Sequence, residues 1–332
     1  MEFFSTPKDI VITSHQNPDG DAYGSSFGLQ SVLTNLGHNA VVISPTDHAA
    51  YIGWLPGVEG VINFEGKDQP KAIKLIQKAD AIFCLDFSAL NRIKEMEVHI
   101  RVSRAVKVLV DHHQEPEDFA DYVFWNEKAA ATCELLYLMC EELGWEDKID
   151  KDAAICLYTG ILTDTGSFKF DATTADIHRI AGKLIEKGIR PSKIHRTLFD
   201  NQSVDRLKFL GFALNERLHY LPEYRLAYFK FSQADLKQFN SQKGDTEGIV
   251  NYGLGIEGVI FSAIFVEMED MVKMSFRSVD DFSVSEFARE NFNGGGHKNA
   301  AGGRSFETLD AVEKKFLNLL PIYKEQLLAQ PA

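Results

Sequence analysis

The chain is short of basic residues, and this shortage excludes one large class of nucleic-acid-binding proteins. Its 332 residues carry 35 lysines and arginines against 48 aspartates and glutamates, which gives a formal charge of −13. Proteins that hold long nucleic acids by neutralising phosphates are normally basic, so we expect no binding of long duplex nucleic acid. Short phosphorylated substrates remain compatible with this charge, because metal ions and a few directed side chains are enough to hold them.

Cysteine pairs and long apolar runs are also missing. The four cysteines, Cys84, Cys133, Cys140 and Cys156, form no C-x-x-C motif and lie in apolar segments, so we expect buried free thiols in a reducing compartment. No uncharged apolar run approaches the roughly 20 residues of a membrane helix, and the N-terminal MEFFSTPKD lacks the layout of a signal peptide. These absences predict a cytoplasmic protein with no membrane partner.

The first part of the sequence alternates short apolar runs with helical patterns. The runs at 9–14, 39–44, 81–85 and 105–110 carry few charges, which is typical of strands buried on both faces of a parallel sheet. Apolar residues at helical spacing occur at 24–36, 132–143, 152–162 and 173–187. The alternation predicts an α/β domain over residues 1–190, with a doubly wound, mostly parallel sheet.

A second, smaller domain is expected after a helical linker. A helix that ends at Gly188 and a new one that begins at Pro191 mark the boundary, and residues 191–218 are the predicted linker. Strand-like patterns at 225–231, 258–266 and 271–278 and helical patterns at 285–291 and 309–328 follow. They predict an α+β domain over residues 219–332.

Acidic and histidine side chains cluster just after predicted strands or at a helix end. They stand in SHQNPDGDAYGS, AIFCLD, VKVLVDHH and GILTDTGSF, and they are His15, Asp19, Asp21, Asp86, Asp111, His112, His113 and Asp164. Ligands of open α/β sheets bind beyond the carboxyl ends of the strands, so most of these side chains are expected to converge there. Converging aspartates repel one another unless cations neutralise them. The pattern therefore predicts a metal centre.

The chemistry suggested by these residues is a two-metal centre. Mixed carboxylate and imidazole ligands suit manganese or magnesium better than the cysteine-rich sets of structural zinc sites. Two such ions about 3.5–4 Å apart can stabilise both oxygens of an in-line displacement at phosphorus. Each residue also has a structural explanation: Asp19 lies in an N-P-D-G turn signal, Asp86 could cap a segment, and Asp164 could end a solvated helix. Their joint placement favours the metal centre.

A glycine cluster in the second domain is a candidate phosphate-binding segment. Gly294, Gly295 and Gly296 precede His297, and successive glycines let backbone N–H groups approach an anion. A helical turn after the cluster would add its dipole, and Arg277 could offer a bidentate guanidinium to the same phosphate. The alternative is a flexible glycine hinge with a surface histidine.

Taken together, these motifs resemble the DHH phosphoesterase superfamily. The resemblance rests on S-H-x-N-P-D-G-D-A, the single aspartates Asp86 and Asp164, the D-H-H motif and the terminal G-G-G-H, and it extends from His15 to about Gly303. The G-G-G-H segment is similar to the DHH-associated C-terminal domain of the nucleotide-cleaving branch. Within the superfamily, the length is most similar to the NrnA-type oligoribonucleases, or nanoRNases, which are also phosphatases of 3′-phosphoadenosine 5′-phosphate (pAp).

The resemblance implies a role for each motif, in an active site between the two domains. It implies two divalent ions, manganese or alternatively magnesium, in two ligand sets that share Asp86. The first set is His15, Asp19 and Asp86, and the second is Asp21, Asp86, His112 and Asp164. Asp111 would orient His112, and His113 would assist the reaction beside the scissile phosphate. The substrate phosphate would contact Arg277, Gly294, Gly295, Gly296 and His297.

The predicted activity is hydrolysis of very short 5′-phosphorylated oligonucleotides to 5′-mononucleotides, together with conversion of pAp to AMP. Three alternatives remain: a soluble phosphodiesterase of cyclic or linear dinucleotides in signalling, a RecJ-like single-strand exonuclease, and a metal-holding binding protein without turnover. The sequence leaves open the polarity of digestion, the preference for RNA or DNA and the oligomeric state, with a homodimer among the options.

Overall fold

The computed structural model describes residues 2–242 and 244–330, which form two compact units, Met1–Asn201 and Gln202–Ala332. The four cysteines, all within the described residues, are buried and free. No helix in the described ranges is both long enough and apolar enough to cross a membrane.

The first unit is built on a six-stranded sheet in which every pairing is parallel, with strand order β3-β2-β1-β4-β5-β6. This confirms the predicted α/β class. The strands are β1 (Asp9–Ser14), β2 (Asn39–Ser44), β3 (Ile62–Asn63), β4 (Ala81–Leu85), β5 (Val106–Asp111) and β6 (Tyr122–Trp125). The sequence patterns predicted four of them and missed β3 and β6, which form the two edges of the sheet.

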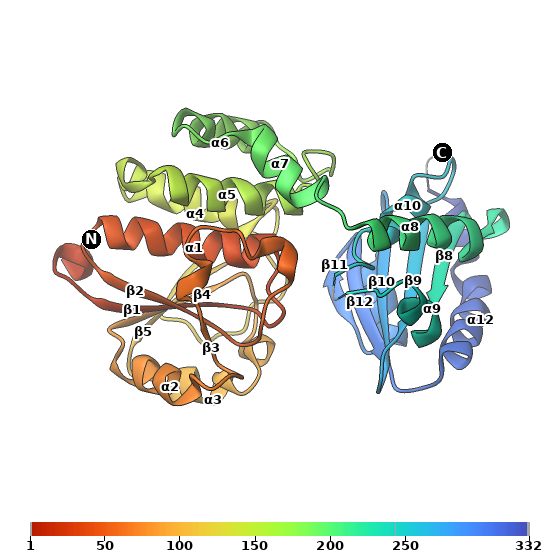
Figure 1. The fold of residues 1–332 in the computed structure, drawn as a ribbon, viewed down its shortest axis with the longest axis horizontal. Coiled ribbons are helices and arrows are strands. Elements are labelled where there is room, and N and C mark those ends of the chain that lie inside the picture. Colours follow the sequence, from red (N-terminus) through yellow and green to blue (C-terminus); the bar gives the residue numbers. More distant parts are fainter. Residues whose placement is uncertain (1, 243, 331–332) are drawn as a thin grey trace. The chain divides into compact units, whose positions relative to one another are not determined.

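Helices cover both faces of this sheet, because its central strands are apolar on both sides. Ile10 and Ile12 join one hydrophobic core and Val11 joins the other, as the alternation of side chains along a strand requires. Figure 1 shows α1, α4, α5 and α6 on one face and α2 and α3 on the other. The helices are α1 (Gly20–Asn35), α2 (Gln69–Lys78), α3 (Met96–Val102), α4 (Thr132–Glu142), α5 (Lys151–Asp164), α6 (Ala175–Glu186) and α7 (Pro191–Phe199).

The second unit contains a mixed six-stranded sheet with strand order β11-β12-β10-β9-β8-β7. Only β8 and β9 pair in parallel, and the other neighbours are antiparallel. The strands are β7 (Leu218–Leu221), β8 (Leu226–Phe231), β9 (Phe261–Glu267), β10 (Val272–Ser278), β11 (Gly295–His297) and β12 (Ala300–Ser305). The sequence predicted β8, β9 and β10, which form the apolar centre of the sheet.

Two clusters of aromatic and aliphatic side chains cover the faces of the second sheet. Phe316 of α12 packs with Phe265 and Phe276 on one face, and Phe209 of α8 packs with Phe231 on the other. The helix expected over 204–218 is therefore present as α8 and packs on the second sheet through its buried face. The helices are α8 (Val204–Glu216), α9 (Gln233–Gln238), α10 (Ile249–Leu254), α11 (Val284–Asn291) and α12 (Leu309–Leu328).

Candidate metal centre

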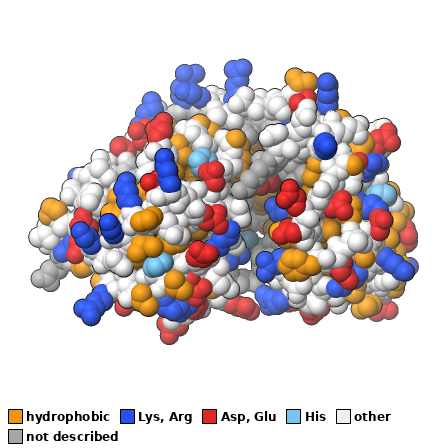
Figure 2. All heavy atoms as spheres, turned by 60° about the horizontal axis from the view of Figure 1, so that its bottom comes forward, with side chains coloured by type: hydrophobic (Ala, Val, Ile, Leu, Met, Phe, Trp, Pro, Cys, Tyr) orange, Lys and Arg blue, Asp and Glu red, His pale blue; other side chains and the backbone are white. Residues whose placement is uncertain are grey.

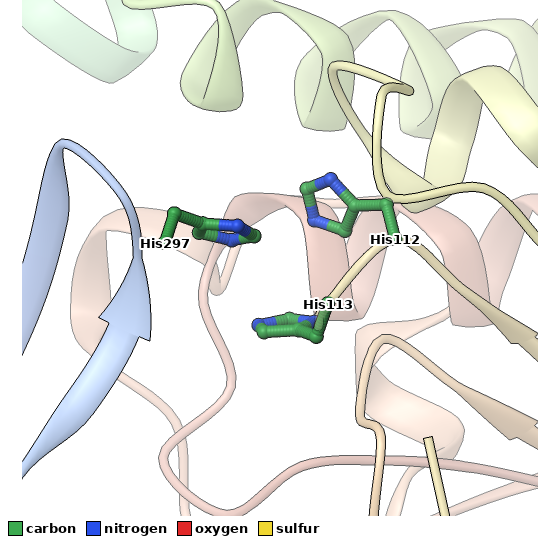
Figure 3. A group of neighbouring side chains, drawn as sticks. All are labelled: His112, His113 and His297. Carbon is green, nitrogen blue, oxygen red and sulfur yellow. The ribbon is translucent and has the colours of Figure 1, made fainter. Parts of the chain in front are cut away.

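Three central strands of the first sheet place polar side chains at the same end of the sheet, beyond the carboxyl ends of the strands. His15 directly follows β1, Asp86 directly follows β4, and Asp111 is the last residue of β5. Because these strands are parallel neighbours, their carboxyl ends lie side by side. His112 and His113 come next in the chain, and Figure 3 shows both imidazoles at this end of β5.

The candidate ligands form two groups that share Asp86. Ligand atoms of His15, Asp19 and Asp86 lie within 4.8 Å of one another, and so do those of Asp21, Asp86 and His112. The Nε2 atom of His15 lies 3.4 Å from Oδ2 of Asp86, and the Nε2 atom of His112 lies 3.5 Å from Oδ1. Each oxygen of one carboxylate thus faces the imidazole of a different group, an arrangement that suits a carboxylate bridging two ions.

The sixth predicted ligand, Asp164, joins this cluster from the end of α5. Its Oδ2 atom lies 3.6 Å from Nε2 of His112. Helix α5 can pack this closely against α1 because residue 160 is glycine: a Cβ atom there would lie 2.6 Å from Oδ1 of Asp21. The structure therefore brings all six predicted metal ligands together.

Both histidines of the cluster are held in the tautomer that a metal ligand needs. The Nδ1 atom of His15 lies 2.8 Å from the carbonyl oxygen of Gln16, and that of His112 lies 3.0 Å from the carbonyl oxygen of Ala129. A carbonyl oxygen can only accept a hydrogen bond, so Nδ1 carries the hydrogen and the neutral ring offers its lone pair at Nε2. In both rings Nε2 is the atom that faces Asp86, so this donor set fits a divalent cation.

The start of α4 supports two of the carboxylates. The carboxylate of Asp21 accepts hydrogen bonds from the backbone N–H groups of Thr132, at 2.6 Å, and Cys133, at 3.0 Å. The Thr132 hydroxyl donates to Oδ1 of Asp86 at 3.0 Å. The first N–H groups of a helix have no partner within the helix and attract negative charge. Sequence reasoning missed Thr132, although its place at the start of a predicted helix was a usable signal.

Asp19 combines the turn role and the ligand role that the sequence offered as alternatives. Its Oδ1 atom caps α1 by accepting from the backbone N–H groups of Asp21 and Ala22, at 3.1 and 3.0 Å. Its Oδ2 atom faces Nε2 of His15 at 3.8 Å. Asp86 in turn has a left-handed backbone with φ of 63°, a conformation that non-glycine residues adopt mainly where surrounding structure or function requires it.

Burial of the carboxyl groups and neighbouring negative charges raise the pKa values of several groups in the cluster. Burial lowers the pKa of His15, but the contacts with Asp86 and Asp19 outweigh it and raise the pKa to about 9. Burial and the neighbouring Asp86 raise the pKa of Asp21 to about 7, and burial and Asp21 raise the pKa of Asp164 well above its ordinary value. Because these groups bind protons so strongly, a cation can replace the protons and bind to the same groups.

Asp111 acts on a different histidine from the one expected. The prediction was that Asp111 orients His112, but the carbonyl oxygen of Ala129 does so. The Asp111 carboxylate instead lies 2.7 Å from Nδ1 of His113, and the indole of Trp125 donates to the His113 carbonyl at 2.7 Å. Asp111 is completely buried, so the His113 ring is held in one orientation with Nε2 at its far edge.

The glycine cluster of the second unit is a β-hairpin and is not followed by the expected helical turn. Gly295–His297 is strand β11, which pairs with β12. Glycine is required at 296, where φ is 148° and a Cβ atom would lie 2.5 Å from the carbonyl oxygen of Ala300. The prediction that a helix dipole adds to anion binding at this cluster is therefore wrong.

The hairpin nevertheless brings Arg277 and His297 to one face of the second sheet. Arg277 of β10 lies opposite Ala300 of β12, and Ala300 lies opposite His297 of β11. Residues directly opposite one another on neighbouring strands point to the same face, so the guanidinium and the imidazole flank a single small side chain. Figure 3 shows His297 on its strand.

Two family models match the chain. The model of the DHH family, N-terminal domain, matches residues 9–161, and the DHHA1 domain model matches residues 224–320. The bifunctional oligoribonuclease and PAP phosphatase NrnA of Bacillus subtilis is 27% identical over 321 residues, which is 95% of this chain and 95% of that protein. The protein of the same name from Thermus thermophilus is 27% identical over 321 residues, or 96% of this chain and 90% of its own.

Two solved structures are also similar to the chain. An exopolyphosphatase-related protein from Bacteroides fragilis is 37% identical, with a TM-score of 0.94 that covers 98% of this chain and 95% of that one. RecJ of Thermus thermophilus, solved in complex with Mn²⁺, is 13% identical with a TM-score of 0.51, covers 98% of this chain and 53% of its own, and shows the fold alone. With both domain models matched in order along the chain, this protein belongs to the DHH phosphoesterase family and carries a DHHA1 domain.

Proposed function

We propose that this protein is a two-metal phosphoesterase that cleaves very short 5′-phosphorylated oligonucleotides to 5′-mononucleotides and converts pAp to AMP. The observation that carries the proposal is the pair of mostly buried ligand groups sharing Asp86, in a chain of the DHH family. The substrates are inferred from the names of the NrnA relatives, which match nearly the whole chain.

The proposed metal sites follow the two ligand groups. His15, Asp19 and Asp86 would hold one divalent ion, and Asp21, Asp86, His112 and Asp164 would hold the other. When bound, two divalent ions supply Lewis acidity toward phosphoryl oxygens and make water nucleophilic near neutral pH. Manganese is the proposed ion, with magnesium as the alternative, because the set contains only carboxylates and imidazoles.

His113 is the proposed proton donor to the leaving oxygen. Its Nδ1 atom is held by Asp111 at 2.7 Å, so a protonated ring would present its second N–H group at Nε2. The buried Asp111 carboxylate would stabilise the imidazolium and keep the ring from rotating, as an aspartate does for the histidine of a catalytic triad. Neither residue needs to bind metal for this role.

The second unit is proposed to recognise the phosphate and sugar of the substrate. Arg277 and His297 flank Ala300 on one face of the sheet, so a bidentate guanidinium and an imidazole N–H group are available together. Gly294–Gly296 carries no side chains that would obstruct an anion, and of its N–H groups that of Gly294 already donates to the Ala288 carbonyl at 3.2 Å. The DHHA1 match over residues 224–320 supports this assignment.

The charge of the chain supports short substrates over long ones. Acidic residues exceed basic ones by 13, and on the face shown in Figure 2 the two kinds are interspersed. Binding of a long polyanion depends on many neutralised phosphates, whereas a dinucleotide needs only the metal ions and a few side chains. We also propose a cytoplasmic location, where such short RNA fragments arise.

A hydrolysis panel tests the proposal. The metal-supplemented protein is incubated with a 5′-phosphorylated diribonucleotide, a 24-nucleotide RNA, pAp, a cyclic dinucleotide and pyrophosphate, and a chelator-treated sample serves as the blank. We expect release of mononucleotides from the dinucleotide and of phosphate from pAp, both abolished by the chelator. Preferential cleavage of the cyclic dinucleotide would move the protein to signalling, equal turnover of the long RNA would favour a RecJ-like exonuclease, and silence on every substrate would refute the proposed activity.

A further inference from the structure

The segment that follows Asp164 has an unusual backbone. Gly166, Ser167 and Phe168 are consecutive residues with positive φ, at 55°, 65° and 64°. For a residue with a side chain, the left-handed conformation is strained, and it persists where the surrounding structure imposes it. Such strain is concentrated at binding sites, so this segment requires an explanation beyond a simple helix end.

Hydrogen bonds hold the segment in this conformation. The backbone N–H group of Ser167 donates to the carbonyl oxygen of Leu162 at 2.8 Å, and that of Phe168 donates to the Thr165 hydroxyl at 3.0 Å. The N–H group of Phe170 donates to the Thr165 carbonyl at 3.0 Å. Thr165 is completely buried, so the loop is attached to a fixed point directly beside Asp164.

Two phenylalanines of the loop have opposite surroundings. Phe168 is half-buried and packs against the rings of Tyr158 and His178, at centroid distances of 6.1 and 5.3 Å. Phe170 is 47% exposed, and within the described residues no aromatic ring pairs with it. Phe168 therefore anchors the loop, while Phe170 presents a large apolar surface to solvent.

The position of the Phe170 ring is defined by contact with Gly166. A Cβ atom at residue 166 would lie 2.5–2.7 Å from three atoms of this ring, so one face of the ring covers the bare glycine backbone. Gly166 is two residues from Asp164, whose carboxylate lies 3.6 Å from Nε2 of His112. An exposed aromatic ring thus belongs to the loop that directly follows the candidate ligand Asp164, and one face of the ring packs against the chain.

We infer that Phe170 is a stacking platform for a nucleobase of the substrate. The inference rests on the proposed function, because a nucleotide whose phosphate lies at the metal centre carries its base about one sugar away. Every base has an aromatic face, so stacking on a phenylalanine gives affinity without selecting a sequence. The exposed Lys169 next to it adds a positive charge suited to a phosphorylated ligand.

The test compares a substrate that has bases with one that lacks them. Phe170→Ala, Phe170→Leu and Phe170→Tyr are assayed with the 5′-phosphorylated diribonucleotide and with a dinucleotide analogue carrying abasic sugars. Loss of one base stack should raise KM for the diribonucleotide by about tenfold in Phe170→Ala, with kcat and turnover of the abasic analogue near wild type. Phe170→Tyr should behave like wild type, and Phe170→Leu should fall between the two.

A second readout and a matched control separate the two proposals. Phe306→Ala removes another exposed phenylalanine, 72% accessible and in the second unit, and should leave KM unchanged. Binding of a dinucleotide containing 2-aminopurine is followed by quenching of its fluorescence, which reports stacking without turnover and should weaken in Phe170→Ala. If the wild type is active but Phe170→Ala lowers kcat/KM equally for both substrates, or for neither, the stacking role is refuted and the proposed function stands. A wild type that neither binds nor cleaves the dinucleotide overturns both.

Discussion

The candidate site residues of the two units differ in how deeply they are buried. In the first unit, charged and imidazole groups are buried at strand ends, and Asp21 and Asp86 are 0% and 2% exposed. In the second unit, the residues of the buried clusters are apolar, with phenylalanines prominent among them, and Arg277 and His297 lie half-buried on a sheet face. Buried charges must be compensated by protons or cations, whereas half-exposed groups remain solvated until a ligand binds.

This difference in burial suits the two units to different tasks, the first to holding metal ions and the second to contacting a substrate. The first unit is suited to holding ions in fixed positions, because its ligands are oriented by carbonyl groups, a helix start and a hydroxyl group. The second unit is suited to contacting a substrate, because its polar groups are accessible. Substitutions of the candidate metal ligands in the first unit should affect metal binding and the chemical step together, and substitutions of Arg277 or His297 in the second unit should affect substrate affinity alone.

The largest effect is expected from Asp86→Asn. Asparagine tolerates the left-handed backbone at this position but removes the negative charge shared by both ligand groups. We expect loss of at least one bound ion and a fall in kcat of about a thousandfold or more. Bound metal is measured by mass spectrometry of the desalted protein, and activity with the dinucleotide and pAp.

Asp152→Asn is the matched control for this variant. Asp152 lies exposed in the first turn of α5, the helix that ends at Asp164, so its loss removes an equal charge outside the cluster. Metal content and activity should both stay at wild-type levels. Full metal content and activity in Asp86→Asn would contradict the bridging role.

A smaller effect is expected in the second unit from Arg277→Ala. Loss of a charge-assisted contact to a phosphate should raise KM by about tenfold or more, with metal content unchanged. Lys273→Ala is the comparison, because Lys273 is an exposed cation four residues earlier on the same strand and face. If both variants raise KM equally, Arg277 acts only through general charge, and the distinction between the two units loses its basis.

The smallest expected effect is a pH dependence of the increase in Tm that a bound metal ion causes. In the metal-free protein the pKa of His15 is about 9, against an ordinary 6.5, and that of Asp21 is about 7, against 3.8. Both folded-state values are raised, so the stability that these protons contribute is present at low pH and is lost as pH rises through about 7 and then 9. A metal ion needs the deprotonated ligands and binds better over that same interval.

Thermal unfolding with chelator and with magnesium measures this difference. The increase in Tm caused by the metal should be larger at about pH 8.5 than at about pH 6, by a few degrees. The same measurement on Asp86→Asn should show a reduced increase at both pH values. A metal-induced increase that is the same at both pH values would argue that protons and metal do not compete in the cluster.

Most of the central strands and the ligand residues could be predicted from the sequence, because their signals are local. β1, β2 and β4 begin and end where the apolar runs do, since strands buried on both faces are mostly apolar. The edge strand β6 was missed because its four residues, Tyr122–Trp125, are mostly exposed and show no burial pattern. Only pairing with β5 makes this segment a strand.

The partners of the site residues depended on contacts between distant parts of the chain. Thr132 reaches Asp86 across 46 residues, and Ala129 orients His112 from 17 residues away. The hairpin at Gly295–His297 consists of residues with little preference for strands, and it forms because β12 offers a partner and the Ser285 hydroxyl donates to the Gly296 carbonyl. No local pattern could indicate these pairings.

The amino-acid sequence alone determined the α/β class, the positions of the buried strands and the identity of the candidate ligands, because hydrophobic periodicity and residue chemistry are properties of short segments. The tertiary structure alone decided that Asp86 faces both imidazoles, that Asp111 holds His113, and that Arg277 and His297 share a face of the second sheet. Hydrogen bonds act over a few ångströms, and only folding brings groups that are tens of residues apart within that range.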